Sequence, residues 1–134
     1  MSTNAPTAAP IVSRRFVILE HTGTASYKPG VHWDLLCDEG ETLRAWEFLE
    51  RLPVPRQMVS ALPDHRRVYL DYEGPISGDR GFVRRVVEGT YELLRESLNE
   101  WAVQLHGKTL RGELHLRRET TEQLLWEAVF HPSI

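Results

Sequence analysis

The sequence has one cysteine and no long apolar run, and each of these absences excludes a class of protein. Cys37 stands alone in 134 residues, so an internal disulfide framework is impossible and a reducing compartment suits the chain. No apolar stretch approaches the roughly 20 residues that a membrane helix needs. Residues 1–10 also lack the basic and apolar segments of a signal peptide. We therefore expect a cytoplasmic protein without membrane contact.

An excess of positive charge is also absent. The formal net charge of −3 argues against a protein that coats nucleic acid through a cationic surface, so any contact with nucleic acid must be local. Only two of the 16 basic residues are lysines, and arginine is the better bidentate partner of phosphate oxygens. Codon usage in a GC-rich genome explains the same bias equally well.

Helical periodicity is scarce, and turn-forming residues separate many short apolar runs. Residues 1–13 are mostly Ser, Thr, Asn, Ala and Pro without apolar periodicity, and they predict a flexible N-terminal leader before a single domain at 14–134. Helical turns are expected only at 55–61 and at the start of 121–126. Candidate strands lie at 15–20, 31–37, 42–48, 67–72, 82–87, 90–94, 101–105, 109–116 and 125–130. They predict a mainly β fold, a small closed or nearly closed β-barrel of about eight short strands, because such strands must hide their edges.

His32 and Asp34 are the first candidates for chemistry. A strand over 31–37 would place His32 and Asp34 on one face and Trp33 on the other, buried. His21 becomes a third ligand if residues 22–30 fold back and make the two strands neighbours. Such a set suits Mn²⁺ or Zn²⁺ and leaves positions for water and substrate. For this motif alone, a surface hydrogen-bonded pair is the commoner arrangement.

A series of short motifs follows in order between residue 15 and about residue 118. They are FVILEH at 16–21, HWDLL at 32–36, RAWE at 44–47, DHRRVYLDYEG at 64–74, GTYE at 89–92 and LHGKTLRG at 105–112. In this order and at these separations, the motifs resemble the 3′-phosphoesterase domain of bacterial DNA ligase D.

The resemblance implies a function as well as a fold. It implies a divalent ion, Mn²⁺ first and Zn²⁺ as the alternative, held by His21, His32 and Asp34. It also implies that His65 and Tyr69 contact the phosphate under attack, and a strand over 65–69 would align the two. The implied substrate is a 3′-phosphate or 3′-terminal ribonucleotide in DNA end repair. Ligase or polymerase partners would be separate chains, and we expect a Mn²⁺-dependent phosphoesterase.

The sequence departs from the family where the phosphate should bind. Leu36 stands where the family has an arginine that clamps phosphate, and alternation places Leu36 on the face of His32 and Asp34. Other cations could have taken over the phosphate, although each alone is more commonly a solvated surface charge. The candidates are Arg66, Arg67, Arg80 and Lys28. If none does, the domain is a catalytically degenerate β-barrel module that binds nucleic-acid ends or nucleotides without turnover.

Overall fold

The structure is a computed structural model that describes residues 14–134, and it confirms a mainly β fold with little helix. The expected leader at 1–13 lies outside the described residues. The elements in chain order are β1 (Arg14–Thr24), β2 (Tyr27–Asp38), β3 (Leu43–Phe48), β4 (Arg56–His65), the 3₁₀ helix η1 (Arg67–Leu70), β5 (Gly74–Pro75), β6 (Phe82–Glu96), β7 (Glu100–Gly107), β8 (Arg111–Arg117) and β9 (Leu125–Pro132).

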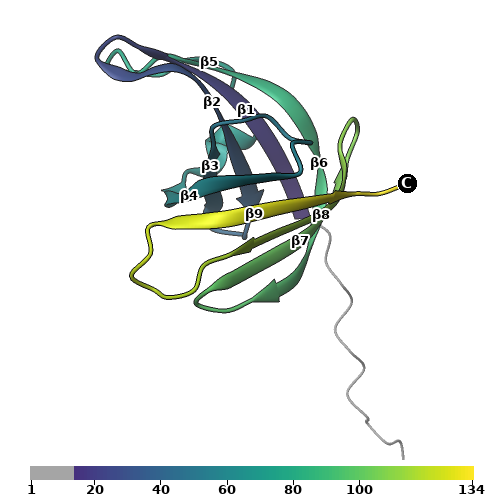
Figure 1. Ribbon diagram of the computed structural model, residues 1–134. Coiled ribbons are helices and arrows are strands. Elements are labelled where there is room, and N and C mark those ends of the chain that lie inside the picture. The colour runs from purple at the N-terminus through teal and green to yellow at the C-terminus, as the bar shows by residue number, and fades with distance from the viewer. Residues whose placement is uncertain (1–13) are drawn as a thin grey trace, which may run out of the picture.

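The strands form one antiparallel sheet that closes on itself. The order is β1-β2-β3-β4-β9-β8-β7-β6-β5, and β6 also pairs with β1, so every strand except β5 belongs to a ring. Figure 1 shows β1, β2 and β6 curving side by side, with β5 beside their upper ends. Closure leaves the ring without a free edge. The ring is uneven, because the strands range from 6 residues in β3 to 15 in β6.

One long strand replaces two expected ones, because 82–87 and 90–94 both belong to β6. Gly89, between them, pairs with Phe16 of β1 and with Gly107 of β7. A Cβ atom at Gly89 would lie 2.2 Å from the backbone oxygen of His106. The glycine therefore permits a close approach of strands and does not form a turn.

The helical turn expected at 55–61 is wrong, because these residues enter β4 and pair with β3 and β9. Burial alternates over the first four residues of β4, with Val59 buried and Met58 47% exposed. Residues 121–124 are likewise not helical but lead into β9 by turns. Within 14–134, no helix has the length and the apolar character needed to cross a membrane.

The strand expected at 67–72 is also wrong, because most of this segment is η1. The N–H of Tyr69 donates to the carbonyl of Arg66, and the N–H of Asp71 donates to that of Val68, which turns the chain. Leu70 is buried in η1 while Val68 is 54% exposed. Burial of Leu70 against the barrel therefore favours the 3₁₀ turn at 67–70 over an extended strand.

Apolar side chains are buried on both faces of β1, β2 and β3. The inner cluster fills the ring and includes Trp46 and Trp101, and Trp33 packs against it from the expected face but is only partly buried. A smaller outer cluster contains Val17, Leu19, Leu36, Leu43, Ala45, Leu70 and Val83. Because η1 supplies Leu70, this short helix covers part of the outer face, and the polar side chains beside it can be buried.

Candidate metal centre

His21, His32 and Asp34 come together on the outer face of β1 and β2. The hairpin between these strands makes His21 and His32 direct cross-strand partners, and Asp34 lies two residues further along β2. Each offers a ligand atom, and these atoms all lie within 4.8 Å of one another. The residues are only 5–7% exposed. The fold-back of residues 22–30 thus gives the arrangement that the sequence predicts.

The orientation of His21 is set by a main-chain hydrogen bond. Its Nε2 lies 2.7 Å from the carbonyl oxygen of Arg80, and because a carbonyl can only accept, Nε2 carries the hydrogen. The other nitrogen, Nδ1, faces Asp34 with 3.7 Å to Oδ2. Metal-binding histidines commonly donate their second N–H to a carbonyl in this way. The hydrogen bond therefore leaves Nδ1 free to bind a cation once its own proton is lost.

Gly81 permits the approach of the Arg80 carbonyl to β1. Its φ of +96° is a left-handed conformation that favours glycine. A Cβ atom at Gly81 would lie 2.0 Å from the backbone oxygen of Thr22, the residue that follows His21. A larger residue would therefore force the loop that carries Arg80 away from the histidine.

The polar atoms at the centre fit a divalent ion. His32 Nε2 lies 3.3 Å from Asp34 Oδ1 and 3.4 Å from Glu47 Oε2. His32 Nε2 and Asp34 Oδ1 are buried without a hydrogen-bond partner, which is costly in a protein interior. Two atoms that bind one ion at about 2.1 Å, with a roughly tetrahedral angle between them, lie about 3.4 Å apart. The two separations from His32 Nε2 are therefore those of ligands around one ion.

Asp34 and His21 shift each other's pKa values in opposite directions even without an ion. Burial by itself raises the pKa of Asp34, but the close imidazoles of His21 and His32 favour the carboxylate, outweigh burial and lower the pKa to about 2. The pKa of His21 is raised, chiefly by the Asp34 carboxylate that its Nδ1 faces. Asp34 is thus an anion at neutral pH, and a proton on His21 competes with a metal ion for the same nitrogen.

A cavity of about 370 Å³ opens over these side chains, a volume within the range of ligand pockets. The structure brings eight of the nine predicted site residues to its lining: His21, Lys28, His32, Asp34, His65, Arg66, Tyr69 and Arg80. Arg67 is the exception, because its side chain contacts Asp38 and the carbonyl of Gly40 outside the cavity. Arg67 is therefore the one phosphate-binding candidate that the structure does not bring to the cavity.

His65 and Tyr69 meet in the cavity, but not through the strand alignment that the sequence suggests. His65 ends β4 and Tyr69 belongs to η1, and the bend between them brings their ring centroids to 5.9 Å. His65 Nδ1 lies 2.9 Å from the carbonyl of Pro63, which can only accept, so Nδ1 carries the hydrogen. Nε2 is therefore the nitrogen of His65 that remains for a ligand.

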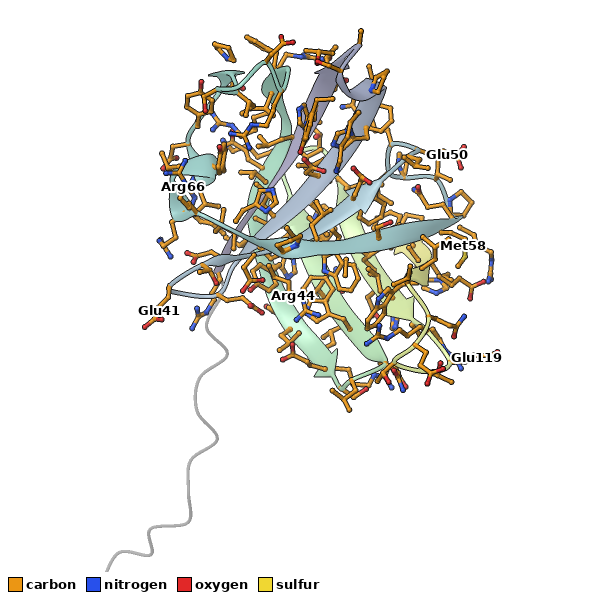
Figure 2. All side chains as sticks on the ribbon, turned by 90° about the vertical axis from the view of Figure 1, so that its left-hand side faces the viewer. Glu41, Arg44, Glu50, Met58, Arg66 and Glu119 are labelled. Carbon is orange, nitrogen blue, oxygen red and sulfur yellow. The ribbon has the colours of Figure 1, made fainter. Side chains whose placement is uncertain are left out.

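The three cations at the cavity differ in how they are held. Lys28 is paired with Glu47 at 2.8 Å, and the Arg80 side chain donates to the carbonyl of Ser77 at 2.7 Å. Arg66 has no side-chain hydrogen bond or ion pair with any residue in 14–134, and its guanidinium lies 5.9 Å from the centroid of the Tyr69 ring. Figure 2 places Arg66 at the edge of the molecule opposite Met58. Arg66 is thus the cation with most freedom to meet an anion.

Leu36 lies on the face that alternation predicts, but it does not reach the cavity. It is fully buried in the outer cluster, together with Leu70 of η1. Leu36 therefore belongs to the apolar outer cluster and not to the lining of the cavity.

Sequence reasoning missed Glu47. The expected strand at 42–48 contained the residue, but its partner strand and register were unknown. Glu47 pairs directly with Asp34 across β2 and β3, and only this register places its carboxylate at the centre.

A scan of the chain against protein-family models found no match. A search of curated proteins also found no matching relative.

Proposed function

We propose that this protein is a metal-dependent phosphoesterase that acts on the 3′ end of a nucleic-acid strand, on a 3′-phosphate or a 3′-terminal ribonucleotide, in DNA end repair. The observation that carries the proposal is the convergence in one cavity of a buried ligand set with a histidine, a tyrosine and an arginine. These are the parts that metal-assisted hydrolysis of a phosphate ester needs.

His21, His32 and Asp34 would hold the ion, with Mn²⁺ as the first choice and Zn²⁺ as the alternative. When bound, a divalent ion polarises a phosphoryl oxygen and makes an attacking water more acidic. His65 can present Nε2 to the substrate as an acid that protonates the leaving oxygen, because Nδ1 is engaged with Pro63. Proton transfer from an oriented imidazole typically contributes about 10²–10⁴-fold to a rate.

Arg66 and Tyr69 are suited to binding the phosphate. Arg66 can present its guanidinium as a fork to two phosphate oxygens, since it makes no hydrogen bond or ion pair within 14–134 and faces only the Tyr69 ring. The Tyr69 hydroxyl makes no hydrogen bond with another residue of this range, so it can donate to a phosphate oxygen. Together they would take the role of the phosphate-clamping arginine that the resembled family has at the position of Leu36.

The surface next to the cavity supports a nucleic-acid substrate over a small phosphate ester. A second hollow of about 320 Å³ shares Arg66, Tyr69 and Ile76 with the first and adds Tyr72. The rings of Tyr69 and Tyr72 meet edge to face at 5.9 Å. An aromatic wall beside a phosphate site can stack a nucleobase or a sugar, and one such contact is typically worth about 1–3 kcal/mol.

A binding module without turnover is the second candidate, and two observations favour it. Leu36 is buried where the resembled family has its phosphate clamp. Lys28 and Arg80 are both engaged with other groups of the chain. Such a module would bind the same 3′ ends through Arg66 and the tyrosines but release no product.

We place either activity in the cytoplasm, beside separate ligase or polymerase chains. The buried free thiol of Cys37 is compatible with a reducing compartment.

The deciding experiment is release of inorganic phosphate from a DNA strand that ends in a 3′-phosphate. With Mn²⁺, the enzyme should release phosphate from this strand and not from a 5′-phosphorylated one. Asp34→Ala should abolish release, whereas Glu113→Ala, a change of the same charge on an exposed carboxylate of β8, should leave it unchanged. A wild-type protein that binds Mn²⁺ and the 3′-phosphate strand without releasing phosphate would instead support the binding module.

A further inference from the structure

We infer that Glu47 is a fourth protein ligand of the ion, so that the centre consists of two histidines and two carboxylates. This inference rests on the proposed metal centre and deepens it. The resemblance to the DNA ligase D domain implies only His21, His32 and Asp34, and the motif at 44–47 assigns no role to the glutamate.

The sheet register places the four side chains as a compact patch on one face. His21 of β1 is the direct cross-strand partner of His32, and Asp34 of β2 is the direct partner of Glu47. His32 and Asp34 are two residues apart on the central strand. Two adjacent pairs on three neighbouring strands therefore place all four on one patch of the outer face, where Glu47 adjoins the group of His21, His32 and Asp34 through its contact with His32.

The distances make Glu47 equivalent to Asp34 in relation to His32. The Nε2 atom of His32 is 3.3 Å from Asp34 Oδ1 and 3.4 Å from Glu47 Oε2. Neither contact satisfies the histidine, because Nε2 remains a buried atom without a hydrogen-bond partner. An unpartnered nitrogen at nearly equal distances from two carboxylate oxygens is the arrangement expected where an ion binds all three. The Glu47 side chain is only 17% exposed, so its carboxylate is held close to the centre.

Lys28 does not exclude Glu47 from the ion. Its Nζ lies 2.8 Å from Glu47 Oε2, and a carboxylate oxygen can accept from a lysine while its other lone pair faces a metal. Ligating carboxylates are commonly hydrogen-bonded by a neighbouring group in this way. The competing account is that Glu47 serves only as the ion-pair partner of Lys28.

A fourth ligand changes which ion supports a reaction. Two carboxylates balance the charge of a divalent ion. Four protein ligands complete the tetrahedral shell that Zn²⁺ prefers, which is typical of structural sites without an open position. An octahedral ion such as Mn²⁺ keeps two positions for water and substrate. The inference therefore assigns the reactive form of the centre to Mn²⁺ and an inert form to Zn²⁺.

The test is Mn²⁺ binding, measured by electron paramagnetic resonance of the free ion, which is independent of catalysis. Glu47→Ala and the isosteric Glu47→Gln should each weaken binding by at least about tenfold. The matched control is Glu20→Gln, which removes the same charge from β1. Binding should change less than twofold in this control. Circular dichroism of each variant shows whether it is folded.

Two further comparisons separate ligation from charge. The weakening in the Glu47 variants should persist at high salt, where long-range electrostatic effects are screened. Lys28→Met removes the ion pair but keeps Glu47, and it should bind Mn²⁺ at least as tightly as the wild type.

The outcomes distinguish this inference from the proposed centre. If His32→Ala loses Mn²⁺ but Glu47→Ala binds it within twofold of the wild type, the three-residue centre stands and the inference is overturned. An equal loss in Lys28→Met and Glu47→Ala also overturns it, because both would then report the broken ion pair. A folded wild type that binds neither Mn²⁺ nor Zn²⁺ overturns the proposed centre and the inference together.

Discussion

His21 donates its Nε2–H to the main-chain carbonyl of Arg80, a residue 59 positions later in the chain. The nitrogen that faces Asp34 is therefore oriented by the loop between β5 and β6. The same loop is fastened to the tip of the β1–β2 hairpin, because Thr24 donates to the carbonyl of Asp79 and Ser26 to its carboxylate. The metal centre thus depends on a loop that supplies none of its side-chain ligands.

Gly81→Ala should weaken metal binding although the residue contacts no ligand directly. The added Cβ would collide with the backbone of Thr22 and displace the Arg80 carbonyl. Loss of such a supporting hydrogen bond typically costs about 10–100-fold in metal affinity. The rise in melting temperature on adding Mn²⁺ should shrink accordingly, since that rise follows binding to the folded state.

Gly78→Ala is the matched control for this change. Gly78 lies in the same loop and has a φ of +76°, but its nearest contact for an added Cβ is 3.7 Å away. The alanine should cost about 1–2 kcal/mol of stability through left-handed strain and leave the Mn²⁺ response intact. Equal Mn²⁺ responses in the two variants would show that the Arg80 carbonyl does not orient His21.

Leu36→Arg should unfold or strongly destabilise the protein and should not restore a phosphate clamp. Leu36 is fully buried in the outer cluster that also contains Leu70, so a guanidinium there would be an unpaired interior charge. Such a charge costs about 3–5 kcal/mol. Urea denaturation measures the change, and Leu36→Met, which keeps the volume and apolarity, should cost less than about 1.5 kcal/mol. A stable Leu36→Arg protein with increased phosphate release would contradict the buried position.

Cys37 should resist thiol reagents in the folded protein. Its side chain is fully buried in the inner cluster, and burial raises the pKa of the thiol well above its ordinary value. Thiolate is the reactive form, so labelling at pH 8 should wait for unfolding. The rate should rise by orders of magnitude in guanidinium chloride. Rapid labelling of the native protein would show that β1 and β2 open readily at this residue.

Strand alternation was sufficient to predict the face shared by His32, Asp34 and Leu36. The period of two along β2 is a local property, and the structure keeps it. The convergence of His21 on this face required only that a short connection pair two adjacent strands. These features follow from neighbours in the chain, which is why sequence alone contains them.

The remaining parts of the site depend on contacts between distant segments. Alternation of Val68, Leu70 and Tyr72 imitates a strand, yet burial of Leu70 on the barrel produces η1 and brings Tyr69 to His65. Glu47 reaches the centre only through the register of β3 on β2. Neither the docking of η1 nor this register has a local signal in the sequence.

The most direct test of the account is to locate the ion in crystals grown with Mn²⁺, by anomalous diffraction above the manganese edge. The account predicts one strong peak between His21 Nδ1, His32 Nε2 and the carboxylate of Asp34, at about 2.0–2.3 Å from each. Glu47 should complete the ligand set. Crystals that hold Mn²⁺ only elsewhere, for instance at the neighbouring rings of His115 and His131, would contradict the central claim.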